Sequence, residues 1–184
     1  PFLGKAPRLT ERSGTFVTIR IANAAGFWGD DIDAPRRLVE SAEVDYLTLE
    51  YLAELTMSIL AHLKSKDPQA GYATDVLDAV RDVIPSLKRQ PRLKIVTNAG
   101  GMNPRSCAIA VAGLLSQAGL GQEKVGVVSG DDLLPRLGEL QSAGCDFQNL
   151  DTGQSLRELS ANPVSANAYL GAVPIVAALA SGSR

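Results

Sequence analysis

A polar, glycine-rich loop inside the segment Leu93–Ala108 (LKIVTNAGGMNPRSCA) carries the strongest chemical signal in this sequence. Gly100 and Gly101 allow the backbone to turn with positive φ and to come close to a ligand. Asn103 can cap the helix that follows, and Pro104 is tolerated there because the first turn has N–H groups without intrahelical partners. Those free N–H groups and the positive end of the helix dipole predict a site for an anion or a carbonyl oxygen.

The loop does not match the motifs of common nucleotide sites. It is neither the G-x-G-x-x-G dinucleotide fingerprint nor a phosphate loop with Gly-Lys-Ser/Thr, so nicotinamide and ATP are poorly supported and the cofactor is unknown. The same residues also suit a plain strand-to-helix turn, and this structural interpretation stays open.

Two carboxylates, Glu50 and Asp30, are the candidate catalytic residues. Glu50 follows an apolar strand pattern and can act as a general base if apolar surroundings raise its pKa. Equally, Glu50 can accept hydrogen bonds from a neighbouring loop and take no part in chemistry. Asp30 belongs to an acidic run that includes Asp33, the expected N-cap of a helix. Capping and solvation account for two carboxylates of this run, so no metal site is predicted.

Alternating strands and helices are predicted to position these residues. β-Branched and apolar residues bounded by turn residues predict strands at Phe16–Ala22, Val44–Glu50, Leu93–Thr97, Lys124–Ser129 and, as a short strand, Asp146–Leu150. Helical spacing and caps predict helices after Asp33, over 52–66, after Thr74 or Asp75, over Pro104–Ala118, after Asp132 through Gln141, and over Ala166–Ala180. The last segment holds the longest apolar run, which is shorter than the ~20 residues of a membrane span and predicts a buried helix.

This alternation, with continuous apolar strands, predicts an α/β fold: a mainly parallel sheet with helices on both faces, in a Rossmann-like three-layer architecture. We expect a flexible leader at residues 1–14 and a single α/β domain at 15–184. Ligands of such sheets bind outside the carboxyl ends of the strands. The ligand-binding residues expected at this edge are Asn23, Gly26, Gly29, Tyr51, Asn98, Gly100, Gly101 and Asn103, with Asp131 and Asp132 as further polar residues after the fourth strand.

Composition argues against several classes of function. The net charge of -2 and a pI of about 5.4 provide no basic field for nucleic acid. The only histidine, His62, falls inside a predicted helix, which disfavours a Ser/His/Asp triad. Cys107 and Cys145 lack metal-ligand spacing and are interpreted as reduced, buried thiols of a cytoplasmic protein. Neither a secretory signal nor a membrane span is predicted.

Five motifs, in order and spacing, resemble the acyclic terpene utilisation (AtuA-like) family: IANAAGFWGDD, DYLTLEYLAELTMSIL, GYATD, KIVTNAGGMNP and ANAYLGA. The resemblance covers about residues 15–182. It implies a cytoplasmic α/β protein linked to the degradation of citronellol- and geraniol-type acids as CoA thioesters. By motif, it implies functional positions at Gly26, Phe27, Gly29 and Asp30, at Glu50 and Tyr51, at Asn98, Gly100, Gly101 and Asn103, and at a later helix start with Asn167, Tyr169 and Gly171.

The resemblance therefore implies an enzyme of acyclic terpene or branched-chain acid catabolism that acts on a CoA thioester or an anionic small molecule. The alternative is a non-catalytic ligand-binding or partner subunit of an acyl-CoA enzyme complex, which predicts a fully paired, buried Glu50 and no open pocket. Some relatives resemble chains joined to acyl-CoA carboxyltransferase-like regions, which implies a homo-oligomer or an acyl-CoA carboxylase-type partner. Relatives also look longer, so we expect part of the pocket outside this sequence.

Overall fold

Three short parallel strands form the central sheet of the structure, a computed structural model that describes residues 18–158 and 162–184. The strands β1 (Ile21–Asn23), β2 (Tyr46–Leu49) and β3 (Lys94–Thr97) lie in the order β1-β2-β3. Ile21 is in register with Tyr46, and Tyr46 with Lys94. The predicted α/β, Rossmann-like class is confirmed, whereas the expected leader at 1–14 and the start of the first predicted strand lie outside the described residues.

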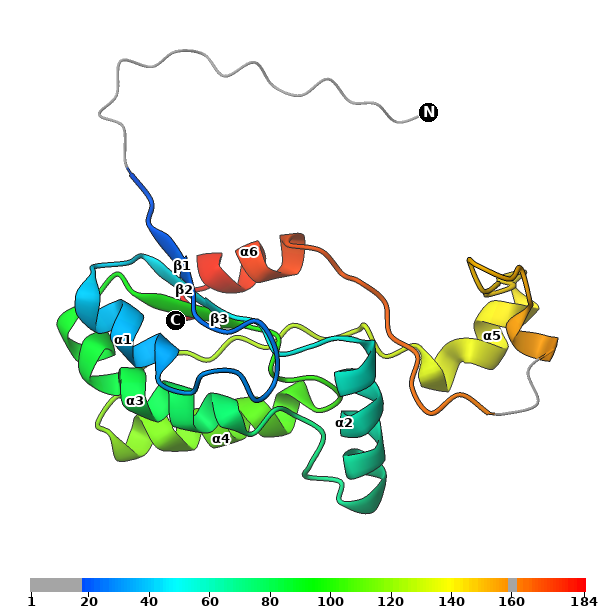
Figure 1. The fold of residues 1–184 in the computed structure, drawn as a ribbon, viewed down its shortest axis with the longest axis horizontal. Coiled ribbons are helices and arrows are strands. Elements are labelled where there is room, and N and C mark those ends of the chain that lie inside the picture. Colours follow the sequence, from blue (N-terminus) through cyan, green and yellow to red (C-terminus); the bar gives the residue numbers. More distant parts are fainter. Residues whose placement is uncertain (1–17, 159–161) are drawn as a thin grey trace, which may run out of the picture.

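Helices flank the sheet on two sides (Figure 1). The α-helices of the described residues are α1 (Ala34–Ser41), α2 (Glu54–Lys66), α3 (Asp75–Arg89), α4 (Pro104–Gln117), α5 (Leu137–Ser142) and α6 (Val173–Ala180), and short 3₁₀ turns span Leu134–Arg136 and Leu156–Glu158. Figure 1 shows α1, α3 and α4 on one side of the sheet and α6 on the other, while α5 lies apart from it. Among the helices of the described ranges, none is long and apolar enough to cross a lipid bilayer.

The core lies between the sheet and the helices α1, α3 and α4. Side chains of β2 alternate, so Leu47 and Leu49 are buried against this helical layer while Tyr46 and Thr48 on the other face are half-buried. The sequence pattern predicted strands covered equally on both faces. In the structure only β2 has fully buried residues, whereas every residue of β1 and β3 is half-buried or exposed.

The predicted strand at Lys124–Ser129 is not formed as a strand. Within it, only Lys124 makes a β-bridge, which runs parallel to Ser183. The N–H of Arg184 donates to the Lys124 carbonyl oxygen (2.9 Å), and the backbone oxygen of Arg184 accepts from the N–H of Ile95 in β3 (2.8 Å). A strand is defined by continuous pairing with a neighbour, and here the neighbour reaches only the first residue of the segment.

The predicted short strand at Asp146–Leu150 is also wrong. The side-chain oxygen of Asn149 accepts from the N–H groups of Asp151 (2.9 Å) and Thr152 (2.9 Å), which closes a turn. Phe147 has a φ of 50°, and Leu150 is fully exposed. The apolar residues of this segment therefore find no sheet to join.

The closing helix begins later than predicted, at Val173 instead of Ala166. Before it, the chain pairs with an earlier segment: the N–H of Leu133 donates to Ala166 (2.7 Å), and the N–H of Ala168 donates to Asp131 (2.8 Å). These hydrogen bonds hold residues 166–168 in an extended conformation, so the helix starts only after the pairing ends.

The expectation that this last helix is buried is wrong as well. Val173 and Val176 in α6 are 81% and 62% exposed, and the helix has no buried residue. The apolar run predicted burial, but in the structure α6 packs on the open side of the sheet with one face turned outward.

Candidate functional site

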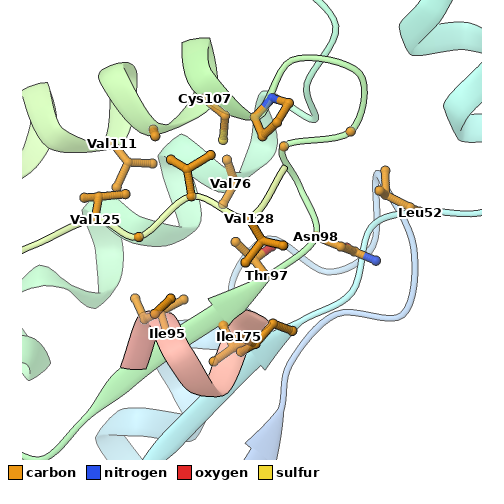
Figure 2. A pocket seen from close by; sticks show the side chains of 18 of the residues that line it. Leu52, Val76, Ile95, Thr97, Asn98, Cys107, Val111, Val125, Val128 and Ile175 are labelled. Carbon is orange, nitrogen blue, oxygen red and sulfur yellow. The ribbon is translucent and has the colours of Figure 1, made fainter. Parts of the chain in front are cut away.

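A large apolar cavity extends along β3 from the carboxyl ends of β2 and β3. Its volume is about 850 Å³, within the usual range for small-molecule sites. Figure 2 shows Cys107 and Val111 of α4 on one side of this cavity and Ile175 of α6 on the other. The residues that surround its mouth, where the strands end, include Glu50, Leu52, Ala53, Met57, Asn98 and Gly100.

Glu50 and Asn98 form a hydrogen-bonded pair at this mouth. The side-chain amide of Asn98 donates to Oε1 of Glu50 (2.5 Å), and the same oxygen accepts from the N–H of Leu52 (3.0 Å). The amide oxygen of Asn98 accepts from the N–H of Tyr51 (2.9 Å). These contacts orient an exposed carboxylate whose Oε2 takes part in neither bond. The structure thus brings together two residues that lie 48 positions apart in the sequence.

The expectation that the glycine-rich loop has several free N–H groups is wrong. The N–H of Gly101 donates to Asn98 (3.1 Å), that of Met102 to Gly71 (2.8 Å), and that of Asn103 to Gly100 (2.8 Å). These bonds close the turn and attach it to the preceding loop. Of the predicted anion donors, the N–H groups of Gly100 in the loop and of Arg105 at the start of α4 are those for which the described residues provide no acceptor.

Gly101 and Asn103 have structural roles in this turn. Gly101 has a φ of 47°, and a Cβ added to it would lie 2.4 Å from Cδ1 of the buried Leu60 in α2. Asn103 accepts from the N–H of Ser106 (3.3 Å), so its predicted role as the cap of α4 is confirmed. Its amide also donates to Pro68 and Ala70, both at 2.9 Å, and so anchors the loop before α3.

The first loop lies away from the large cavity. Asp30 accepts from the N–H of Gly26 (2.9 Å) and from the N–H of Asp31 (2.8 Å), so its carboxylate stabilises the loop that carries it. Asp30 lines a second cavity of only about 10 Å³, and Gly29, with a φ of 91°, provides the turn beside it. The structure therefore does not bring Asp30 to the mouth at which Glu50 lies.

Tyr51 and Asn23 are also engaged inside the fold. Tyr51 is 4% exposed and lines the small second cavity, and burial, followed by the nearby charge of Asp75, raises the pKa of Tyr51 to about 12. Asn23 accepts from the hydroxyl of Thr48 (2.8 Å) and donates to Ala25 (3.1 Å), which ties the end of β1 to β2. Neither residue lines the large cavity.

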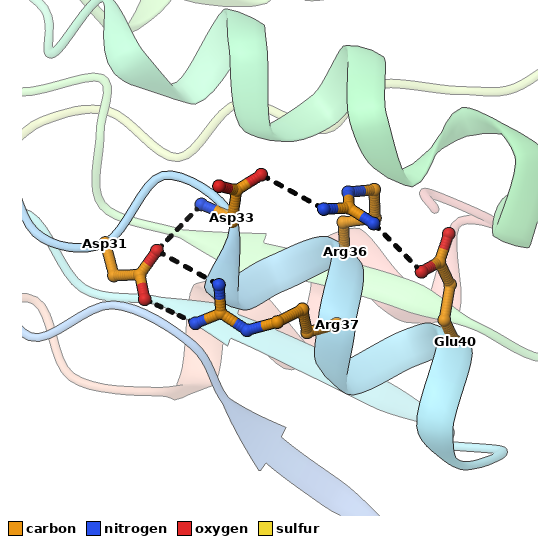
Figure 3. A network of polar contacts seen from close by, with 5 residues as sticks. All are labelled: Asp31, Asp33, Arg36, Arg37 and Glu40. Atoms are coloured by element: carbon orange, nitrogen blue, oxygen red, sulfur yellow. Dashed lines mark hydrogen bonds and ion pairs between the residues drawn. The ribbon is translucent and has the colours of Figure 1, made fainter.

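The acidic run after β1 is paired with arginines (Figure 3). Asp31 forms an ion pair with Arg37. Arg36 lies between Asp33 (3.2 Å) and Glu40 (3.2 Å). Asp33 occupies the predicted N-cap position of α1, but its side chain makes no capping hydrogen bond. Within the described ranges, no group of three or more His, Cys, Asp or Glu residues is arranged to hold a metal ion.

This network predicts a weak dependence of stability on pH. The hydrogen bond from Arg37, followed by that from the N–H of Asp33, lowers the pKa of Asp31. The contribution of Asp31 is therefore present above the ordinary Asp pKa and is lost as pH falls through the lowered value. Both partners are about half exposed, so we expect Asp31→Asn to lower Tm at pH 7 by no more than roughly 2 °C. Thermal melts from pH 7 to pH 2.5 test this, and a difference in Tm that does not decrease as the pH falls contradicts it.

The two cysteines differ, contrary to the expectation that both are buried. Cys107 is buried beside the cavity, whereas Cys145 is exposed. Burial raises the pKa of the Cys107 thiol to about 11, which lowers its thiolate fraction at pH 8. We expect iodoacetamide to label Cys145 at least about 100-fold faster than Cys107 in the native protein. Mass spectrometry of samples taken over time measures both labelling rates in the native protein. Equal rates contradict the assignment of Cys107 as buried and Cys145 as exposed.

The apolar residues that form the walls of the cavity were not among the predicted site residues. Val111 and Ile175 belong to apolar helix faces, whose pattern does not tell a cavity wall from a packed core. Asn167 donates to the carboxylate of Asp131 (2.8 Å), and both line the cavity. The family motif ANAYLGA singled out Asn167, but the structure places it in an extended segment before α6 instead of at a helix start.

Comparison with known proteins identifies the family. The model of the acyclic terpene utilisation family protein AtuA matches residues 19–184. Neither the curated proteins nor the solved structures compared with this chain gave a match. The family match spans the sheet, the glycine-rich turn and α6, and therefore every residue of the cavity described above. This chain belongs to the acyclic terpene utilisation family.

Proposed function

We propose that this protein is a cytoplasmic enzyme of acyclic terpene or branched-chain acid catabolism, and that it acts on a CoA thioester at the mouth of the large cavity. Membership of the family supports a role in acyclic terpene utilisation. The observation that carries the enzymatic part is the exposed carboxylate of Glu50, which Asn98 orients beside an apolar cavity. Asp30 is not proposed as a second catalytic residue, because it stabilises its own loop.

Glu50 is proposed as the general base or acid of the reaction. A carboxylate in hydrogen-bond reach of a substrate proton can remove it, and a fixed orientation raises the efficiency of this transfer. Leu52, Ala53 and Met57 provide apolar contacts for a branched acyl group next to Glu50. The N–H of Gly100 is the proposed donor to the carbonyl oxygen of the thioester, where negative charge develops.

The alternative, a non-catalytic partner subunit, predicts that Glu50 is buried and fully hydrogen-bonded and that no pocket is open beside it. Glu50 is exposed, and both of its hydrogen bonds fall on one oxygen. Leu52, Ala53 and Met57 line the mouth of the cavity beside it and provide an apolar surface for a small molecule. These observations favour the enzyme over the partner subunit.

A thermal-shift panel tests the proposed substrate class. The panel contains a branched medium-chain acyl-CoA, its free acid, CoA alone, ATP and NAD⁺. We expect the acyl-CoA to raise Tm most. A ligand at 100 times its Kd stabilises the native state by about 2.7 kcal/mol. That stabilisation corresponds to roughly 5–10 °C for a chain of this size.

A matched pair of variants locates the binding. Ala53→Phe places a ring at the mouth and should abolish the shift, whereas Leu55→Phe, on the neighbouring exposed surface outside the cavity, should retain it. A shift with nucleotides alone contradicts the proposed substrate class. An equal loss of shift in both variants contradicts the proposed location.

A further inference from the structure

The interior of the large cavity has the geometry of an unfilled strand position. Arg184 is hydrogen-bonded on both sides, to Lys124 (2.9 Å) and to Ile95 of β3 (2.8 Å). The segment 124–128 and β3 are therefore separated by the width of one strand, and Ser183 and Arg184 enter the gap between them. Beyond these two residues, the gap between Ile95–Thr97 and Val125–Val128 forms the interior of the cavity (Figure 2).

The side chain of Arg184 fixes the point at which the chain enters this gap. The guanidinium of Arg184 donates to the backbone oxygens of Leu93 (3.0 Å), Gln90 (3.0 Å) and Leu87 (2.5 Å), and it pairs with Glu123. These contacts attach it to the carboxyl end of α3 and to the start of β3. The direction in which the backbone enters the gap is thus set by these four side-chain contacts and by the two backbone hydrogen bonds of Arg184.

The edge of β3 offers backbone groups to such a strand. Backbone groups of alternate strand residues point to the same side, so Thr97 presents its N–H and carbonyl to the side on which Ile95 bonds to Arg184. An apolar small molecule cannot satisfy these groups, whereas an extended polypeptide can. Val111 of α4 and Ile175 of α6 cover the gap from opposite sides, as helices cover a central strand of a parallel sheet.

The chain topology provides a second, independent argument. From β3 the chain passes through α4 to segment 124–128, and then returns through α6 toward β3. Figure 1 shows α4 and α6 on opposite sides of the sheet. Connections between parallel strands of one sheet are right-handed. A connection from β3 to segment 124–128 and a connection back toward β3 therefore place their helices on opposite faces of the sheet. A strand between β3 and segment 124–128 completes this pattern.

We propose that the interior of the cavity binds an extended, apolar polypeptide strand that continues the path of Ser183 and Arg184, parallel to β3. The strand converts segment 124–128 into a paired strand and buries the side of α6 that faces the cavity, at Ile175, Ala178 and Leu179. This inference does not depend on the proposed function, because the substrate is placed at the mouth beside Glu50 and the strand along Ile95–Thr97.

Three versions of the chain extended after Arg184 test this proposal. One adds Ile-Val-Val-Thr, one adds Gly-Ser-Gly-Ser, and one adds Val-Pro-Val-Pro, which is apolar but lacks N–H groups at alternate positions. Amide hydrogen exchange at Thr97 and at residues 125–128 is measured by NMR. We expect the first extension to slow exchange at these amides by at least about tenfold relative to residues 1–184, and the other two to leave it unchanged.

Two further variants of the Ile-Val-Val-Thr chain show where the strand binds. Val111→Lys, inside the cavity, should remove the added protection, and Ile109→Lys, exposed on the same helix, should retain it. Equal exchange in all three extended chains overturns the proposal. Protection that increases with protein concentration also overturns it, in favour of a second copy as the occupant. None of these measurements includes acyl-CoA, so their failure leaves the proposed function untouched.

Discussion

Glu50→Gln is expected to lower kcat for a branched acyl-CoA by about 10²- to 10⁴-fold, with little change in the affinity for the ligand. The substitution preserves the size and the hydrogen-bonding capacity of the side chain but removes the ionisable group, and general acid–base catalysis contributes an acceleration of this order. Steady-state turnover, together with a thermal-shift titration of the same variant, separates loss of chemistry from loss of binding.

Glu54→Gln is the matched control for this prediction. Glu54 is exposed at the start of α2 and lines the same cavity, but Asn98 does not hold it. We expect its turnover to stay within about threefold of the unmodified protein, as for a surface substitution without a catalytic contact. Equal losses in both variants point to a general effect of charge at the mouth, and an active Glu50→Gln variant contradicts the catalytic role.

Gly101→Ala is expected to destabilise the fold by roughly 2–4 kcal/mol. The left-handed backbone at φ 47° strains a residue with a Cβ, and that Cβ would lie within 2.4 Å of the buried Leu60. For a chain of this length, the loss corresponds to a fall in Tm of about 5–15 °C. Differential scanning calorimetry and urea denaturation measure it.

The control substitution is Gly113→Ala in α4. No atom lies within 4 Å of the added Cβ, and the position is helical, so we expect a gain of about 0.5–1 kcal/mol. If Gly101→Ala proves as stable as the unmodified protein, the close packing of α2 against the glycine-rich turn is incorrect. A stable variant would also return Gly101 to the set of candidate ligand contacts.

Local sequence signals predicted the parts of the structure that depend on nearby residues. Asn103 and Pro104 predicted the start of α4, because a cap involves residues within one helical turn. Apolar segments between turn residues predicted β2 and β3 to within two residues of their observed starts. The convergence of Glu50 and Asn98 at one sheet edge followed from the parallel arrangement of those strands.

Features that depend on distant residues could not be predicted in the same way. The N–H of Met102 is occupied because Gly71 lies beside it, and nothing in the spacing of the loop indicates that contact. The valines of segment 124–129 have strand propensity, yet a strand also requires a neighbour, which a single sequence does not reveal. Asp30 was predicted as a site residue because it follows a strand, but its carboxylate accepts hydrogen bonds within its own loop.

An NMR titration with a branched acyl-CoA tests most directly whether the mouth of the cavity is the ligand site. The structure predicts the largest chemical-shift changes at the side-chain amide of Asn98 and the backbone amide of Gly100, with the amides of Gly26 and Asp31 unmoved. The opposite pattern, with changes at Gly26 and Asp31 and none at Asn98, would contradict the proposed site.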